Sequence, residues 1–250
     1  MKPTQFLACA IAVIAIAGCD SKAGDAATNT PLQLEQVKPP AGGDWSQVVN
    51  PTPEGGFVMG NPNATVKLIE FGSMTCPHCA EFDEQGAGKL VDTYVKSGQV
   101  SWEFRNYVRD ALDLAASLVA RCNGPKTFFP LTRALYKEQT SWFAKVQAAP
   151  QEQQAALQNL PPNRQFLEMA RLAGFQQWAA ARGVPEAKTT QCLSDENSVN
   201  QLVQMNSDVT NRFPEFQGTP GFVINGKLIK DTGTWDKLEP QLRSALGERG

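Results

Sequence analysis

The pattern of hydrophobic and polar positions changes several times along the chain. Residues 66–71 are mostly apolar and rich in β-prone types, and a turn signal at Asn61-Pro62 precedes them, so we expect a central strand there. Residues 100–105 alternate in polarity, which predicts a second strand. Between these strands, apolar residues recur at helical spacing up to about Lys96. Because parallel strands need a long crossover connection, this β-α-β order predicts a parallel pair.

Beyond the second strand, the spacing becomes helical and later returns to a strand pattern. Residues 111–213 have helix-type spacing almost throughout. Residues 221–229 predict a β-hairpin, because Asn225-Gly226 accepts the positive φ angles of a tight turn. A short amphipathic helix is expected over 235–246. The order β-α-β, helical block, β-β-α is that of an α/β protein with a thioredoxin-like fold and a large all-helical insertion.

We expect the packed domain to occupy residues 45–248. Its thioredoxin parts are predicted at about 57–107 and 216–248, with the helical insertion at about 108–215. The preceding residues 19–44 have few large apolar side chains and are rich in Ala, Thr, Gly and Pro. Such a segment cannot bury enough apolar surface to offset the entropy lost on ordering, so we predict a flexible tether.

The first 18 residues have the composition of a signal peptide. Lys2 supplies positive charge, and the apolar run 6–17 would span about 18 Å as a helix, too short for about 30 Å of bilayer hydrocarbon. Ile16-Ala17-Gly18-Cys19 resembles the lipobox of bacterial lipoproteins, which implies cleavage before Cys19 and a lipid on that residue. Cys9 would leave with the signal peptide. The alternative is an ordinary cleaved signal with a chance cysteine, and both interpretations predict export.

Charge and composition exclude several classes of protein. The net charge is −2, from 23 basic and 25 acidic residues, so no basic footprint for nucleic acid is present in the sequence. With 42% hydrophobic and 19% charged residues, the chain fits neither a disordered nor a multi-span membrane protein. Six cysteines in 250 residues are too few for a disulfide-stapled miniprotein, so each cysteine needs its own explanation.

The strongest chemical signal is Cys76-Pro77-His78-Cys79. We expect Cys76 at the N-cap of the helix that follows the first strand, where free backbone N–H groups and the helix dipole stabilise a thiolate. Pro77 suits the first helical position, and His78 would add a donor or a positive charge beside the sulfur. Cys79, one turn further, can attack a mixed disulfide on Cys76. Because the reduced form would hold a stabilised thiolate, the disulfide form is expected to be oxidising.

Metal-based interpretations of this motif are weaker. Attachment of c-type haem needs a histidine directly after the second cysteine, where Ala80 stands. Zinc needs two more ligands, whereas Cys122 and Cys192 are isolated and the sole histidine lies inside the motif. Copper delivery would want a further histidine, and Met74 alone is too weak a ligand. We therefore expect no metal and no cofactor beyond a redox-active Cys76–Cys79 disulfide.

Residues 71–79, Phe-Gly-Ser-Met-Thr-Cys-Pro-His-Cys after a strand, resemble the active site of DsbA-like thiol–disulfide oxidoreductases. Gly218-Thr219-Pro220 is similar to the cis-proline loop of that family, and the resemblance covers about residues 57–248. It implies that Cys76 is the exposed nucleophile and Cys79 the resolving thiol. It also implies a cis bond at Pro220, with Thr219 and Pro220 facing the sulfurs, where an extended substrate segment can pair with the backbone.

Two residues refine this resemblance. Glu70, late in the first strand, matches a buried acid that in the family helps proton transfer at the resolving cysteine, and desolvation would raise its pKa toward neutral pH. The alternative is a glutamate that faces water at the end of the strand. Thr219 departs from the valine of the best-known oxidases and matches related isomerases and reductases, so the direction of catalysis stays open, although His78 favours an oxidant.

The remaining two cysteines, Cys122 and Cys192, lie in the predicted helical insertion. In an exported protein, leftover cysteines more often pair than stay free, so we predict a structural disulfide, with two buried free thiols as the alternative. The large aromatic residues of the insertion are expected in its core. They are Phe128, Phe129, Trp142, Phe166 and Trp178.

Together these features predict a membrane-tethered protein thiol–disulfide oxidoreductase. The leading hypothesis is an oxidase that donates the Cys76–Cys79 disulfide to reduced, unfolded exported proteins and is re-oxidised by a quinone-linked membrane partner. One alternative is a reductase or isomerase that a membrane electron donor keeps reduced. Another is a non-catalytic thiol- or metal-binding lipoprotein. The expected location is the periplasm, with the lipid on Cys19 in the inner membrane.

Overall fold

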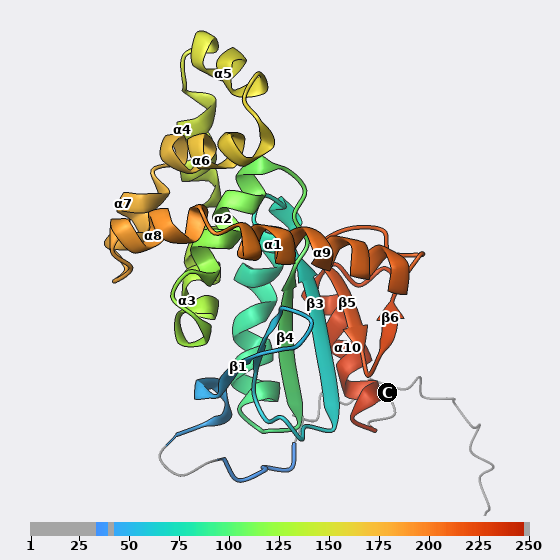
Figure 1. Ribbon diagram of the computed structural model, residues 1–250. Helices are drawn as coiled ribbons and strands as arrows, with labels where there is room; N and C mark the ends of the chain where they lie inside the picture. The colour runs from blue at the N-terminus through green and yellow to red at the C-terminus, as the bar shows by residue number, and fades with distance from the viewer. Residues whose placement is uncertain (1–33, 40–42, 248–250) are drawn as a thin grey trace, which may run out of the picture. The chain divides into compact units, whose positions relative to one another are not determined.

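The structure is a computed structural model that describes residues 34–39 and 43–247. Its centre is a mixed six-stranded sheet in the order β1-β2-β4-β3-β5-β6 (Figure 1). The strands are β1 Val49–Pro51, β2 Phe57–Met59, β3 Val66–Gly72, β4 Val100–Asn106, β5 Gly221–Ile224 and β6 Lys227–Ile229. The predicted strands at 66–71 and 100–105 and the predicted hairpin are therefore confirmed.

Helices join and cover these strands. The first part of the fold contains the 3-10 helix η1 Trp45–Gln47, the α-helix α1 Pro77–Phe82 and the π-helical segments η2 Asp83–Ala87 and η3 Leu90–Val95. The insertion holds α2 Ala111–Arg121, α3 Pro125–Lys137, α4 Gln139–Gln147, α5 Gln151–Gln158, α6 Pro162–Ala173, α7 Phe175–Ala180, α8 Glu186–Leu193 and α9 Glu196–Arg212. The last helix is α10 Trp235–Ala245.

The register of the sheet determines which side chains face the predicted active site. Strands β3 and β4 run parallel, as predicted, and β3 pairs antiparallel with β5. Glu70 stands opposite Phe104 on one side and Phe222 on the other. Because side chains alternate between the faces of a strand, these residues point to one face and Phe71 points to the opposite face.

Different helices pack on the two faces of the sheet. On the Glu70 face, Phe82 of α1 contacts Phe222, Phe128 of α3 contacts Phe104, and Trp235 of α10 packs on η3. On the other face, α9 places Val209 beside Phe71 in a buried cluster. Figure 1 shows α9 crossing in front of the strands, with α10 on the opposite side. The thioredoxin core and the insertion are therefore packed against each other through both faces.

The insertion is helical throughout, as its spacing predicted. Its five predicted core aromatics are all buried, and α2 packs against α3, α6 and α8. Cys122, at the end of α2, is joined by a disulfide to Cys192 of α8. The predicted bridge is thus present, and it ties together two helices separated by 70 positions in the sequence.

The predicted start of the packed domain is corrected by the structure. Within the segment assigned to a flexible tether, residues 34–39 pack on the domain: the Val37 amide donates to the Ser97 carbonyl, and its carbonyl accepts from the indole of Trp45. These hydrogen bonds to the backbone order the segment, and the pattern of hydrophobic residues does not predict them. Strands β1 and β2 were also not predicted as strands, because three residues are too few for a periodic signal.

The predicted signal peptide 1–18, Cys9 and the lipidation candidate Cys19 lie outside the described residues. Among the helices that are described, none combines the length and the apolar character that a membrane-spanning segment needs.

Candidate active site

Cys76-Pro77-His78-Cys79 begins the helix that follows β3, as predicted. Cys76 is the N-cap residue of α1, with extended backbone angles, and Pro77 occupies the first turn. Proline is tolerated there because the first backbone N–H groups of a helix have no partner within it. The strand therefore delivers Cys76 to the positive end of the helix dipole.

The environment of the Cys76 sulfur strongly favours a thiolate. Its pKa is lowered from 9.0 to about 5, chiefly because the Cys79 thiol donates to it, while burial opposes the shift. Thr219 and the backbone N–H groups of Cys79 and His78 also favour the anion. In the thiol form, Cys76 Sγ donates to the Thr219 carbonyl at 3.1 Å. The Thr219 hydroxyl, buried and unpaired among the described residues, is available to the thiolate.

Two expectations about this sulfur are corrected. Cys76 is not an exposed nucleophile, because the residue exposes only 2% of its surface and the Thr219 carbonyl lies against its sulfur. The His78 imidazole is not beside the sulfur either. It is 76% exposed, and its Nδ1 lies 3.5 Å from Glu81. At about 100° per residue, the second position after Cys76 projects away from the face that carries both cysteines, so His78 acts on the sulfur through its backbone.

Cys79 has the opposite character. It is fully buried, and burial raises its pKa well above 9.0, with further raising contributions from the hydrogen bond it makes to Cys76 and from the charges of Cys76 and Glu70. In the structure both cysteines are free thiols. One sulfur therefore ionises readily while its neighbour keeps its proton, which is the asymmetry that an attacking thiolate and a resolving thiol require.

Glu70 is buried under the redox pair and does not face water. Its carboxylate accepts a hydrogen bond from the Trp102 indole at 3.0 Å. Burial raises its pKa well above 4.5, and the neighbouring charge of Asp83 raises it further. Because burial disfavours the charged form, this carboxyl keeps its proton to a higher pH than an exposed glutamate does, and it can exchange that proton with a nearby group.

Helices of the insertion hold the loop that leads to Cys76, which sequence reasoning did not predict. The buried Asp113 of α2 accepts from the Ser73 hydroxyl at 2.6 Å and from the Met74 amide at 2.8 Å. Burial raises the pKa of Asp113 to about 6, against the effect of these bonds. The Gln139 side chain of α4 donates to the carbonyls of Met74 and Cys76, at 2.8 and 3.0 Å. Neither contact leaves a local sequence signal, because each partner lies far away along the chain.

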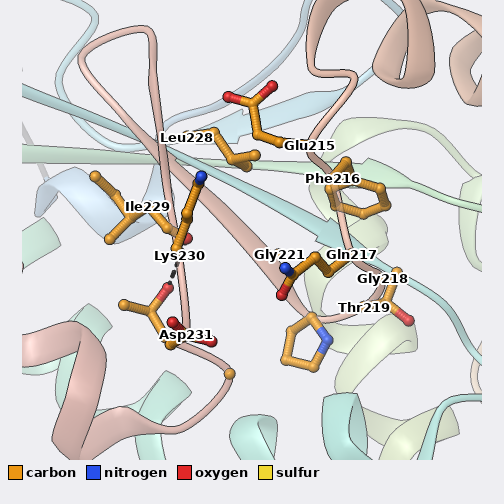
Figure 2. Close-up of a pocket in the computed structure, with 13 residues that line it drawn as sticks. Glu215, Phe216, Gln217, Gly218, Thr219, Gly221, Leu228, Ile229, Lys230 and Asp231 are labelled. Carbon is orange, nitrogen blue, oxygen red and sulfur yellow. Dashed lines mark hydrogen bonds between the residues drawn. The ribbon is translucent and has the colours of Figure 1, made fainter.

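The loop before the last hairpin faces the same sulfur. The Thr219–Pro220 peptide is cis, as the resemblance implied. Thr219 and Pro220 also line a pocket of about 230 Å³. Figure 2 shows Glu215 to Gly221 on one side of this pocket and Leu228 to Asp231 on the other. The arrangement places an open, partly apolar depression beside the residue that contacts Cys76.

A metal site would need several ligating side chains close together. Among the described residues, no group of three or more His, Cys, Asp or Glu side chains is arranged to hold an ion. The groups that the structure brings together at the site are the two free thiols of Cys76 and Cys79 and the buried carboxyl of Glu70.

Comparisons with known proteins agree with this geometry. The matching family is described as thioredoxin, and the match covers residues 52–244. A relative from Rickettsia bellii, provisionally described as a protein-disulfide oxidoreductase, is 26% identical over 79% of this chain and 67% of its own length. The chain spans 61% of a similarly described relative from Rickettsia felis.

Solved structures show the same fold. A protein-disulfide isomerase from Novosphingobium aromaticivorans is 32% identical, with a TM-score of 0.72 over 76% of this chain and 97% of its own. Wolbachia pipientis alpha-DsbA1, at 20% identity and a TM-score of 0.62, covers 79% and 93% of the two chains and supports the fold alone. The chain therefore belongs to the thioredoxin family, is a thiol–disulfide oxidoreductase, and has a DsbA-like fold.

Proposed function

We propose that the protein is an oxidase that donates a Cys76–Cys79 disulfide to other proteins through a mixed disulfide on Cys76. The observation that carries this proposal is the place of Cys76 at the N-terminus of α1, 3.1 Å from the Thr219 carbonyl, where its pKa is lowered to about 5. The thiolate exists only in the reduced form, so its stabilisation favours that form. The disulfide form therefore accepts electrons readily. The partner's thiolate attacks Cys76, and Cys79 leaves with the electron pair and takes up a proton.

The position of Cys76 supports the assignment of roles. Its sulfur lies 3.1 Å from the carbonyl of Thr219, a residue that lines the pocket in Figure 2. An extended client segment that pairs with the Thr219 backbone would bring its own cysteine to Cys76. Pro77 sets the first helical turn, and Glu70 serves as the proton-exchanging group for Cys79.

Trapping the intermediate tests this division of roles. With a reduced client protein, the oxidised wild type should form client disulfides. The Cys79→Ala variant, treated with a client that carries an activated disulfide, should accumulate a mixed disulfide on Cys76 that mass spectrometry identifies. Cys76→Ala is the matched control and should accumulate none. A mixed disulfide on Cys79 in that control, or client oxidation without Cys76, would refute the proposed function.

A second candidate function is disulfide isomerisation. Two observations favour it: the solved structure with 32% identity is described as a protein-disulfide isomerase, and Thr219 precedes the cis-proline. A client with scrambled disulfides separates the two functions. An isomerase in its reduced form restores the native pairing, whereas an oxidase in its reduced form leaves the client inactive.

We further propose that the protein works in the periplasm, held at the inner membrane by a lipid on Cys19. DsbA-like relatives act outside the cytoplasm on exported proteins and exchange electrons with a membrane partner. On this proposal, a quinone-linked oxidase restores the disulfide. Metabolic labelling with a fatty-acid analogue tests the anchor: label should be incorporated by the wild type and lost in Cys19→Ala, and label retained in the variant would exclude it.

A further inference from the structure

The two peptide groups that flank Cys76 each accept a hydrogen bond from a side chain of the insertion. The first group joins Thr75 to Cys76. Its carbonyl accepts from the Arg109 guanidinium at 2.9 Å, and its N–H donates to the Ser73 carbonyl at 3.1 Å. Because a peptide group is planar, bonds at both of its polar atoms fix the orientation of the whole plane. The backbone that enters Cys76 is therefore held from both sides.

The second peptide group joins Cys76 to Pro77. Its only hydrogen-bonding atom is the Cys76 carbonyl oxygen, because proline lacks an N–H. This oxygen accepts from the Gln139 side chain at 3.0 Å and from the Ala80 amide at 3.2 Å. With both neighbouring planes held, Cys76 has a φ of −87° and a ψ of 118°. At these angles its Sγ lies 3.1 Å from the Thr219 carbonyl.

Arg109 is itself anchored, although the residue is exposed. Its backbone amide donates to the buried Asp113 carboxylate at 2.9 Å. The Thr75 hydroxyl accepts from the same guanidinium nitrogen as the carbonyl, at 3.3 Å, and donates to the Asp110 carboxylate at 3.1 Å. Two consecutive residues at the start of the insertion therefore bind both the backbone and the side chain of Thr75, directly before the nucleophile.

The charge of Arg109 does not act on the sulfur directly, because Arg109 is not among the groups that lower the pKa of Cys76. Those groups are the Cys79 thiol, Thr219 and the backbone N–H groups of Cys79 and His78. Each of them acts through a hydrogen bond, and hydrogen bonds weaken steeply with distance and angle. A rotation of the Cys76 backbone would therefore weaken all of them together.

We propose that Arg109 is a positioning residue for the nucleophile: together with Gln139, it fixes the peptide groups on either side of Cys76 and so holds the sulfur between the N-terminus of α1 and the Thr219 carbonyl. The guanidinium acts through the Thr75 carbonyl. The inference rests on the proposed role of Cys76, and it holds for oxidation and for isomerisation. On this proposal, the helical insertion takes part in the reactivity of the site as well as in the stability of the fold.

The test compares the full-length wild type with Arg109→Ala, in which an exposed side chain is removed and the melting temperature should hardly change. The midpoint of the pH profile for iodoacetamide alkylation of Cys76 should rise. The equilibrium constant for oxidation of glutathione by the protein disulfide should fall by at least about threefold, the effect of half a pKa unit. The Cys76 amide, followed by NMR, should exchange its hydrogen faster. Gln139→Leu should change all three quantities in the same direction.

Lys67→Ala is the matched control, because it removes the same charge. The Lys67 ammonium also donates to a backbone carbonyl, that of Pro62, at the end of β3 remote from the motif. This variant should keep the wild-type midpoint and equilibrium constant. An unchanged midpoint and equilibrium constant in Arg109→Ala, or equal shifts in Lys67→Ala, would overturn the positioning role. A wild-type midpoint near 9.0 would instead refute the proposed function, because no stabilised thiolate would then exist.

Discussion

Two sulfurs one helical turn apart differ in acidity because of where each one lies. Cys76 has the helix N-terminus, the Cys79 thiol and Thr219 around it, and its pKa falls to about 5. Cys79 has mainly buried side chains around it, and its pKa rises. At neutral pH, the reduced site therefore holds one thiolate, and this charge is what the oxidised site lacks.

The first prediction concerns the pH dependence of Cys76. Because the folded-state pKa lies below the ordinary value, the thiolate exists above about pH 5 and is lost as pH falls through that value. The alkylation rate of the reduced protein should thus be level above pH 6 and fall about tenfold per unit below the pKa. Mass spectrometry of iodoacetamide adducts measures this rate. A midpoint near 9.0 would contradict the assignment.

The second prediction concerns Glu70. In Glu70→Gln the side chain keeps its shape and can no longer exchange a proton, so the resolving step should slow by at least about tenfold at pH 7. Alkylation of Cys76 should remain fast. Glu103→Gln, on the opposite face of the neighbouring strand, is the control. Equal rates in wild type and Glu70→Gln would show that Glu70 is only a packing residue.

For single residues, the sequence predicted the features that depend only on neighbouring positions in the chain. The N-cap position of Cys76 and the first-turn position of Pro77 follow from the spacing of a few residues, and the structure agrees. The direction of the His78 side chain and the closeness of Thr219 to the sulfur depend on three-dimensional packing. This is why the imidazole was wrongly placed beside Cys76.

Between elements, the insertion supports the loop before the motif. Removing the Gln139 side chain should lower stability, because this side chain donates hydrogen bonds to two buried carbonyl groups. We predict that Gln139→Leu lowers the free energy of unfolding by about 1–3 kcal/mol, the usual effect of leaving buried acceptors unpaired. Chemical denaturation measures it. The exposed Gln204→Leu should change stability by less than about 0.5 kcal/mol, and an equally small effect at Gln139 would refute the role.

Long elements with a clear period were predictable, and short or long-range features were not. Strand β3, strand β4 and the closing hairpin have enough apolar residues for a signal. Strands β1 and β2 have three residues each and exist because β1 pairs with β2 and β2 pairs with β4. The docking of residues 34–39 depends in the same way on backbone partners contributed by the fold.

For the whole molecule, the disulfide between α2 and α8 is expected to act on stability alone. It closes a loop with a sequence separation of 70, and neither of its cysteines is among the groups that shift the pKa of Cys76 or Cys79. The double variant Cys122→Ala/Cys192→Ala should lose about 2–4 kcal/mol of unfolding free energy, with an unchanged Cys76 alkylation rate. Calorimetry measures the change in stability, and iodoacetamide alkylation measures the rate at Cys76. A loss of alkylation with intact stability would instead place this disulfide in the redox chemistry.

Whether the protein is an oxidase is decided by the reduction potential of the Cys76–Cys79 couple, measured against glutathione at pH 7. The stabilised Cys76 thiolate favours the reduced form, so we expect an oxidising couple, between about −180 and −120 mV. The Cys122→Ala/Cys192→Ala variant isolates this couple from the structural disulfide. A value near about −270 mV, typical of a reducing thioredoxin, would contradict the oxidase assignment.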